Sequence, residues 1–80
     1  MEELKSVIYN LKFYTIEGYG VFGEELRNDI YQVNLYGYDE NVDTRELLEH
    51  AYEIASEENL FDVVVSADYE IYKTVQTKIR

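Results

Sequence analysis

Apolar and polar side chains alternate along residues 6–16, which read SVIYNLKFYTI. A period of two residues is typical of a β-strand that turns one face toward a core. The pattern therefore predicts a strand over 6–16. The side chains expected to face the core are Val7, Tyr9, Leu11 and Phe13.

A second strand is predicted over residues 30–38, IYQVNLYGY, after a stretch rich in glycine. The intervening residues 17–29 contain Gly18, Gly20 and Gly23 together with several charged side chains, which is typical of a long hairpin connection. The side chains of the second strand that are expected to face the core are Tyr31, Val33 and Leu35.

Helical signals begin at Asp43, a residue type that caps helix N-termini well. Glu46 follows three residues later, as in a capping box. Asn59 readily adopts the left-handed conformation that ends a helix. Together these signals predict a helix over 44–58.

Two further strands are predicted after the helix, over 61–66 (FDVVVS) and 69–79, with a tight turn near Ala67 and Asp68. The predicted order of elements is β-β-α-β-β. This order favours one α+β domain over residues 1–80, with a four-stranded antiparallel sheet and one amphipathic helix packed on one face.

The predicted helix has two chemically distinct sides when its residues are placed at steps of about 100°. The apolar side is formed by Leu47, Leu48, Ala51, Ile54 and Ala55. The opposite side is formed by Glu46, Glu49, Glu53 and Glu57. His50 lies beside these glutamates and is expected to face solvent. The apolar side is expected to cover the sheet, because an amphipathic helix gains most of its stability from packing.

The formal charge of the chain is −10, and all of it lies in residues 39–70. This stretch holds eleven carboxylates and one base, Arg45, whereas the remaining 48 residues carry six acids and six bases. A strongly acidic protein binds nucleic acid and anionic membranes poorly and favours basic partners. We therefore expect neither direct nucleic-acid binding nor membrane binding.

The glutamates of the predicted helix span roughly 16 Å at about 1.5 Å per residue, or one charge per roughly 5 Å. A DNA strand carries one phosphate per about 3.4 Å, which is of the same order. No Lys or Arg lies between Glu46 and Glu57, although opposite charges four residues apart would stabilise the helix. The pattern favours a partner-binding surface, and a solvated face that only keeps the protein soluble is the alternative. The residues predicted to bind a partner are Glu46, Glu49, Glu53, Glu57, Asp39, Glu40, Glu58, Asp62, Tyr36 and Tyr38.

Tyrosine is unusually frequent, with nine residues in the chain. Several are predicted at outward or edge positions of the sheet, where they could form an aromatic patch: Tyr14, Tyr36, Tyr38 and Tyr72, with Phe22 in the hairpin loop. Tyrosine is common at binding surfaces. An interaction surface, plain cover for the sheet and a dimer of two packed sheets all remain open at this point.

No catalytic, metal-binding or cofactor-binding group is predicted. The chain has no cysteine and one histidine, so no nucleophile and base are evident. Gly18, Gly20 and Gly23 match G-x-G-x-x-G, but no crossover helix fits before the next strand. Asp39 begins a calcium-like D-x-N-x-D string, but the sixth position is Thr44 instead of glycine.

A cytoplasmic location is expected. The chain contains no run of 18 apolar residues, so no membrane span is predicted. The first residues, MEELKSV, lack the basic start and apolar core of a secretion signal.

The cysteine-free, tyrosine-rich composition and the acidic band from Asp39 to Glu70 resemble those of small acidic inhibitors from phages and mobile elements, the anti-CRISPR and anti-restriction proteins. The resemblance implies a non-catalytic DNA mimic that occupies the basic groove of a CRISPR effector or a restriction enzyme inside a bacterial host. The alternative function is a homodimeric structural or regulatory module with a tyrosine-rich sheet interface.

Overall fold

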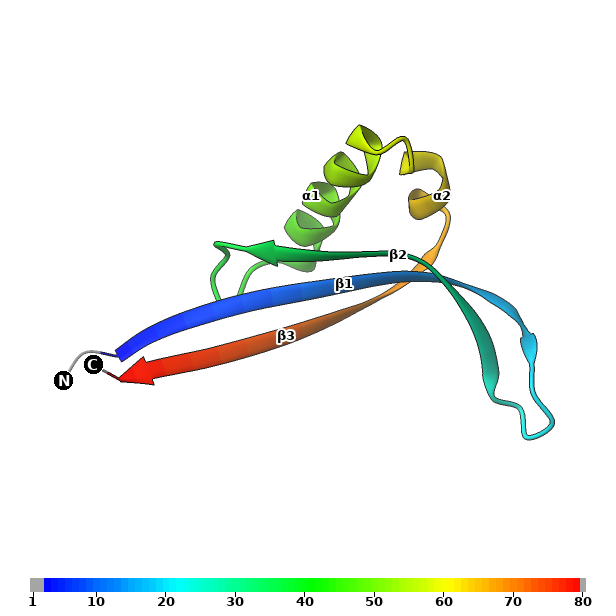
Figure 1. The fold of residues 1–80 in the computed structure, drawn as a ribbon, viewed down its shortest axis with the longest axis horizontal. Helices are drawn as coiled ribbons and strands as arrows, with labels where there is room; N and C mark the ends of the chain where they lie inside the picture. Colours follow the sequence, from blue (N-terminus) through cyan, green and yellow to red (C-terminus); the bar gives the residue numbers. More distant parts are fainter. Residues whose placement is uncertain (1–2, 80) are drawn as a thin grey trace.

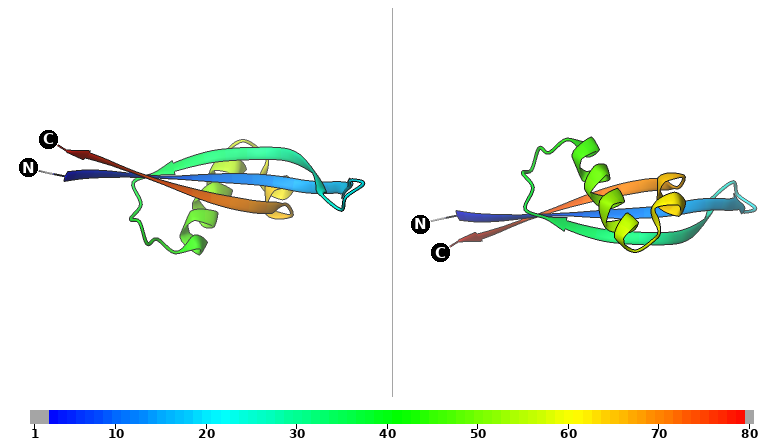
Figure 2. Two further views of the ribbon diagram at one scale, coloured as in Figure 1. Left: turned by 90° about the horizontal axis from the view of Figure 1, so that it is seen from below. Right: turned by 90° about the horizontal axis from the view of Figure 1, so that it is seen from above.

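The computed structural model of the protein describes residues 3–79 and contains three long strands and two short helices over that range (Figure 1). The elements are, in order, β1 (Glu3–Tyr19), β2 (Glu25–Tyr36), α1 (Thr44–Glu57), α2 (Phe61–Val65) and β3 (Asp68–Ile79). The strands form one antiparallel sheet in the order β2-β1-β3. Both helices lie on the same face of this sheet, which the two views of Figure 2 show from opposite sides.

The predicted four-stranded sheet with one helix is wrong, because residues 61–66 do not form a strand. The segment forms α2 instead, and the Ser66 hydroxyl donates to the carbonyl oxygens of Asp62 and Val63 at its end. The left-handed turn at Asn59 brings the segment back beside α1, so it lies in the helix layer and packs Val64 into the core instead of extending along the sheet. A short apolar run does not distinguish a strand from a helix, and here only Val64 is buried.

The β1–β2 hairpin is longer than predicted, since the strands continue through most of residues 17–29 and leave a tip of only 20–24. The register is interrupted twice without ending the strands, once between Ile16 and Gly18 and once between Phe13 and Tyr14. Such bulges bend a strand and increase its twist. The hairpin accordingly curves away from the rest of the sheet in Figure 1.

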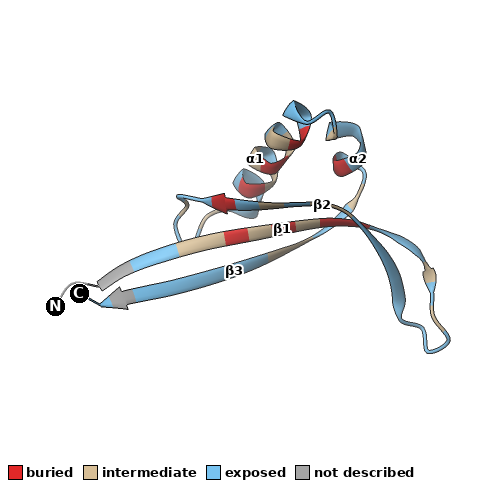
Figure 3. Ribbon diagram, in the orientation of Figure 1, coloured by how far each residue is buried: buried red, intermediate tan, exposed pale blue. Residues whose placement is uncertain are grey.

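The predicted inward faces of the first two strands are confirmed. The buried core combines one side of the sheet with the inner sides of both helices, as Figure 3 shows. Its members are Tyr9, Leu11, Phe13, Leu35, Leu47, Ala51, Ala55 and Val64. Phe13 lies at the centre, with ring centroids 6.2 Å from Tyr31, 6.0 Å from Tyr52 and 6.3 Å from Tyr69. The aromatic cluster therefore joins all three strands to α1.

The predicted start of the helix at Thr44 is confirmed, and its end differs by one residue, since α1 ends at Glu57 instead of Glu58. Asp43 caps α1, and its carboxylate accepts a hydrogen bond of 3.1 Å from the backbone N–H of Arg45. At the other end Asn59 has a φ of 61°, which is left-handed. The Leu60 N–H then donates to the Ala55 carbonyl over 2.8 Å, so the last turn is closed in the usual way.

The molecule is elongated, with extents of 52 × 34 × 18 Å and a radius of gyration of 15.6 Å. A compact chain of this length would have a radius of gyration of about 12 Å. The difference arises because the sheet is three-stranded only in its middle. The hairpin continues beyond the last β1–β3 pair, Tyr14 with Asp68, and β1 and β3 continue together beyond the last β1–β2 pair, Ile8 with Tyr36.

Candidate partner-binding surface

The outer side of α1 presents a row of four exposed carboxylates, which we call the acidic face. Its members are Glu46, Glu49, Glu53 and Glu57. They point outward because Leu47, Ala51 and Ala55 on the other side of the helix are buried against the sheet. The predicted division of the helix into an apolar and an acidic side is therefore confirmed.

Little positive charge lies near the acidic face. Arg45 Nε is 3.4 Å from Glu49 Oε1, but both side chains are largely exposed, so this ion pair contributes at most about 0.5 kcal/mol. Among residues 3–79, Glu46, Glu53 and Glu57 have no ion-pair partner. Most of the negative charge of the acidic face is therefore not neutralised by ion pairs within the described residues.

The carboxylates predicted to support this face are divided by the structure into two groups. Glu40 is paired with Lys5 at 3.3 Å, and Glu58 accepts a hydrogen bond of 2.5 Å from the Tyr31 hydroxyl. These two side chains are engaged within the molecule. Asp39 and Asp62 are exposed, and within the described part of the chain neither carboxylate has an ion-pair partner.

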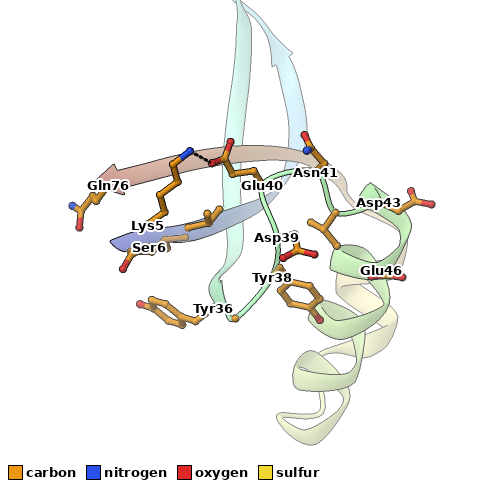
Figure 4. Close-up of a pocket in the computed structure, with 14 residues that line it drawn as sticks. Lys5, Ser6, Tyr36, Tyr38, Asp39, Glu40, Asn41, Asp43, Glu46 and Gln76 are labelled. Carbon is orange, nitrogen blue, oxygen red and sulfur yellow. Dashed lines mark ion pairs between the residues drawn. The ribbon is translucent and has the colours of Figure 1, made fainter. Parts of the chain in front are cut away.

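An open hollow of about 1220 Å³ continues the acidic face toward the loop 37–43 (Figure 4). The loop, the first turn of α1 and the adjoining ends of β1 and β3 line it. Asp39, Asp43 and Glu46 contribute carboxylates, while Lys5 pairs with Glu40 on the opposite side. Carboxylates outnumber the cation in this hollow, so it favours a Lys or Arg side chain over an anion.

The two tyrosines predicted to bind a partner have different environments. Tyr36 is 63% exposed and lines the hollow. Tyr38 is half-buried and hydrogen-bonded to Nδ1 of His50 over 2.7 Å. The expected outward position of Tyr38 and the expected solvent-facing position of His50 are therefore wrong. Gly37, with a φ of 84°, ends β2 and redirects the chain toward α1.

The tyrosines on the uncovered face of the sheet are held in a polar network. The Arg27 guanidinium lies 4.2 Å from the centroid of the Tyr14 ring, and Lys12 Nζ lies 5.4 Å from that of Tyr72. Glu70 accepts a hydrogen bond of 2.5 Å from the Tyr72 hydroxyl and is also paired with Arg27. These contacts lower the pKa of the Glu70 carboxyl, the Tyr72 hydrogen bond most and Arg27 next.

The expected aromatic patch is consequently not continuous. Cationic side chains lie against Tyr14 and Tyr72, and Phe22 is at the hairpin tip, where it is 94% exposed. Of the predicted group, Tyr36 and Phe22 are the rings left largely exposed without an aromatic or cationic contact among the described residues.

An aromatic pair beside the acidic face was missed by the sequence prediction. Tyr52 and Phe61 meet edge to face, with centroids 6.2 Å apart and an interplanar angle of 84°. Together with Glu49, Glu53 and Ser56 they line a second hollow of about 420 Å³. Phe61 was assigned to a strand, whereas α2 presents it on the surface, where it is 43% exposed. The sequence signal that could have indicated this pair is Asn59, where the chain turns back toward α1.

No protein-family model matches the chain, and no curated protein or solved structure is significantly similar to it. Over the described residues, neither helix is long and apolar enough to cross a membrane. In the same part of the chain, no group of three or more His, Asp or Glu residues is placed to hold a metal ion. The function is therefore argued from the charge and shape of the surface.

Proposed function

We propose that this protein is a non-catalytic inhibitor that occupies the basic groove of a nucleic-acid-binding complex, such as a CRISPR effector or a restriction enzyme, as a DNA mimic. One observation carries the proposal: the acidic face of α1 is exposed to solvent, and Glu49 is its only member with an ion pair among the described residues. A groove lined with Lys and Arg would be neutralised by such a row.

The spacing of the charges supports this assignment. Successive members of the acidic face are three or four residues apart, which places them about 5–6 Å from one another along one side of the helix. Phosphates follow one another at about 3.4 Å of axis along a DNA strand. A set of Lys and Arg side chains arranged for phosphates can adjust over such a difference, because their stems are long and flexible.

The surroundings of the acidic face add directional contacts. The hollow at Asp39 and Asp43 suits an inserted cationic side chain. The Tyr52–Phe61 pair supplies an aromatic surface next to Glu49 and Glu53. Partly buried aromatic residues are typical anchors of protein interfaces, whereas exposed charges mainly accelerate association. The partner-contacting surface proposed here thus combines both kinds of group.

The structure also narrows the proposed set of contact residues. Glu40 and Glu58 already have intramolecular partners, so their contribution to a complex is expected to be small. The principal contacts are assigned to Glu46, Glu49, Glu53, Glu57, Asp39 and Asp62, with Tyr36 at the edge of the hollow. No direct contact with nucleic acid is proposed.

The test uses the protein immobilised on a resin and incubated with purified nuclease complexes, first a CRISPR effector and then a restriction enzyme. The proposal requires that DNA added in solution displaces the bound complex and that salt weakens the binding. The informative variant carries Glu49→Lys and Glu53→Lys. We expect its affinity to fall by at least about tenfold, or 1.4 kcal/mol, because two attractive contacts become repulsive.

A matched control carries Glu17→Lys and Asp29→Lys, which changes the net charge by the same amount, from −10 to −10 + 4 = −6. Both positions are exposed and lie on the hairpin strands, away from α1. If the control weakens binding as much as the α1 variant, the effect is one of overall charge and the mimic is excluded. A complex that binds equally well in the presence of excess DNA would also refute the proposal.

A further inference from the structure

The hollow of about 420 Å³ between α1 and α2 has an aromatic wall and an acidic wall. The aromatic wall is the Tyr52–Phe61 pair, whose rings meet at 84° with centroids 6.2 Å apart. Glu49, Glu53 and Ser56 complete the lining. Tyr52 and Glu53 follow Glu49 by three and four residues, so all three lie on the same side of α1. A group that enters the hollow therefore meets aromatic carbon and carboxylate oxygen together.

Both rings of the aromatic wall are held in place by the core. Tyr52 is half-buried, and its ring centroid is 6.0 Å from that of Phe13. Phe61 is 43% exposed at the start of α2, which is anchored by the buried side chain of Val64. The helix α2 packs beside α1, as Figure 1 shows. Since the wall is formed before any ligand arrives, little ordering cost opposes binding.

The carboxylates of the hollow can accept a cation. Among residues 3–79, Glu53 has no ion-pair partner. Glu49 lies 3.4 Å from Arg45, but an ion pair as exposed as this one contributes little, so an incoming cation can share or replace it. Glu49 and Glu53 are also one helical turn apart, where like charges repel each other. A cation between them removes that repulsion, whereas an anion would add to it.

We propose that this hollow binds the guanidinium group of an arginine side chain. A guanidinium is planar and stacks on aromatic rings, while its N–H groups donate to carboxylates. A lysine ammonium is a compact and strongly hydrated charge, so it gains less from the aromatic wall. An apolar side chain would remove water from the carboxylates without giving them a partner. The proposal rests on the proposed function for the source of the arginine, which is the basic groove of the inhibited complex.

Titration with three small probes tests the site without any partner protein. N-acetylarginine methylamide carries the proposed group, N-acetyllysine methylamide carries the other common cation, and N-acetylcitrulline methylamide is an uncharged analogue of the arginine probe. Backbone amide NMR signals are followed at constant ionic strength, because salt screens exposed charges. We expect saturable shifts at Ser56 and Phe61 with the arginine probe, and an affinity about fivefold lower for each of the other two. An analogue that binds as tightly as the arginine probe overturns the proposal, as does the absence of saturable shifts at these residues.

Two pairs of variants separate this site from general attraction of a cation to an acidic chain. Phe61→Leu should weaken binding of the arginine probe by about fivefold, because an aromatic face is lost. Phe22→Leu makes the same change at the hairpin tip, where the ring is 94% exposed, and should leave binding unchanged. Glu53→Gln should also weaken binding, and more than Glu46→Gln, because Glu46 lines the other hollow. Equal effects within either pair would refute the arginine site.

The arginine site and the proposed inhibitory function can fail separately. If the arginine probe binds as expected while no nuclease complex binds the chain, the site is supported and the inhibitory function is refuted. If a nuclease complex is displaced by DNA but binds the wild type and Phe61→Leu with equal affinity, the mimic is supported. In that case the hollow holds no arginine of the groove, and the inference drawn from it is wrong.

Discussion

Tyr38 and His50 are joined by a hydrogen bond of 2.7 Å between the phenol oxygen and Nδ1. Their rings are 5.8 Å apart and tilted by 58°. The contact fastens the chain that leaves β2 to the middle of α1, and both side chains are partly buried. It holds the acidic loop beside the first turn of the helix together with the Tyr9 hydroxyl, which donates to the Asp39 carbonyl over 2.7 Å.

The variant Tyr38→Phe should lower the free energy of unfolding by about 1 kcal/mol, because the ring remains while the hydrogen bond is lost. For a chain of this size the loss corresponds to a fall in melting temperature of about 4–8 °C. Tyr36→Phe is the matched control, since Tyr36 is 63% exposed and has no hydrogen bond among the described side chains. Equal melting temperatures for the two variants would show that the Tyr38–His50 bond does not stabilise the fold.

Glu70 is expected to make the stability of the protein depend on pH. Tyr72 and then Arg27 lower the pKa of its carboxyl below the ordinary value of 4.5. The stabilisation is therefore present above about pH 4.5 and is lost as the pH falls through the lowered pKa. Glu70→Gln should destabilise the protein at neutral pH, and the difference from the wild type should shrink at about pH 3. Urea unfolding at both pH values measures this.

The control for Glu70 is Glu17→Gln, an exposed carboxyl of β1 without a recorded ion pair in the described chain. Its stability difference from the wild type should not change between the two pH values. A constant difference for Glu70→Gln as well would mean that its contacts do not favour the ionised carboxyl.

The elements with a clear periodicity could be predicted from the sequence. The alternation over 6–16 identified the core face of β1, because Tyr9, Leu11 and Phe13 are in fact buried. The helix over 44–57 was predicted nearly to the residue, since Asp43 and Asn59 are strong local end signals that need no tertiary contact. In both cases the decisive interactions lie within a few residues of one another.

The rest of the fold depends on contacts between distant residues. Residues 61–66 contain a run of valines that suits a strand or a buried helix equally well. What decides is that the segment lies beside α1, where Val64 joins a core formed with residues of β1 and β2. Gly18 was interpreted as part of a loop, yet it pairs with Leu26 of β2, so that β1 continues past it. Neither fact can be obtained from a local pattern.

Only part of the candidate surface could be predicted, because the rest of it also depends on contacts between distant residues. Helical periodicity was sufficient to place the four glutamates of the acidic face on one side. It could not show that Glu58 is bound by Tyr31, which is 27 residues earlier in the chain, or that Tyr38 turns toward His50. The Tyr52–Phe61 pair likewise exists only because α2 folds back beside α1.

Tyr31 should ionise later than an ordinary tyrosine. Burial, and then the hydrogen bond to Glu58, raise its pKa from 10.0 to about 12. The neutral phenol is favoured in the folded state, so its stabilisation is complete below about pH 10 and is lost as the pH rises through about 12. In an absorbance titration, Tyr31→Phe should remove the step near pH 12. A step near pH 12 that is unchanged in Tyr31→Phe would contradict this assignment.

Substitution of Leu47 can show whether α1 is stabilised by packing or by intrinsic helix propensity. It is 2% exposed and belongs to the core, so Leu47→Ala should cost about 2–5 kcal/mol through lost burial and the cavity left behind. Alanine is the better helix former, so a helix held by propensity alone would be unharmed. Leu26→Ala, at a 50% exposed site on the hairpin, should change stability by less than about 0.5 kcal/mol. Urea unfolding of both variants decides the question, and a neutral Leu47→Ala would mean that the acidic face does not rely on the sheet for its position.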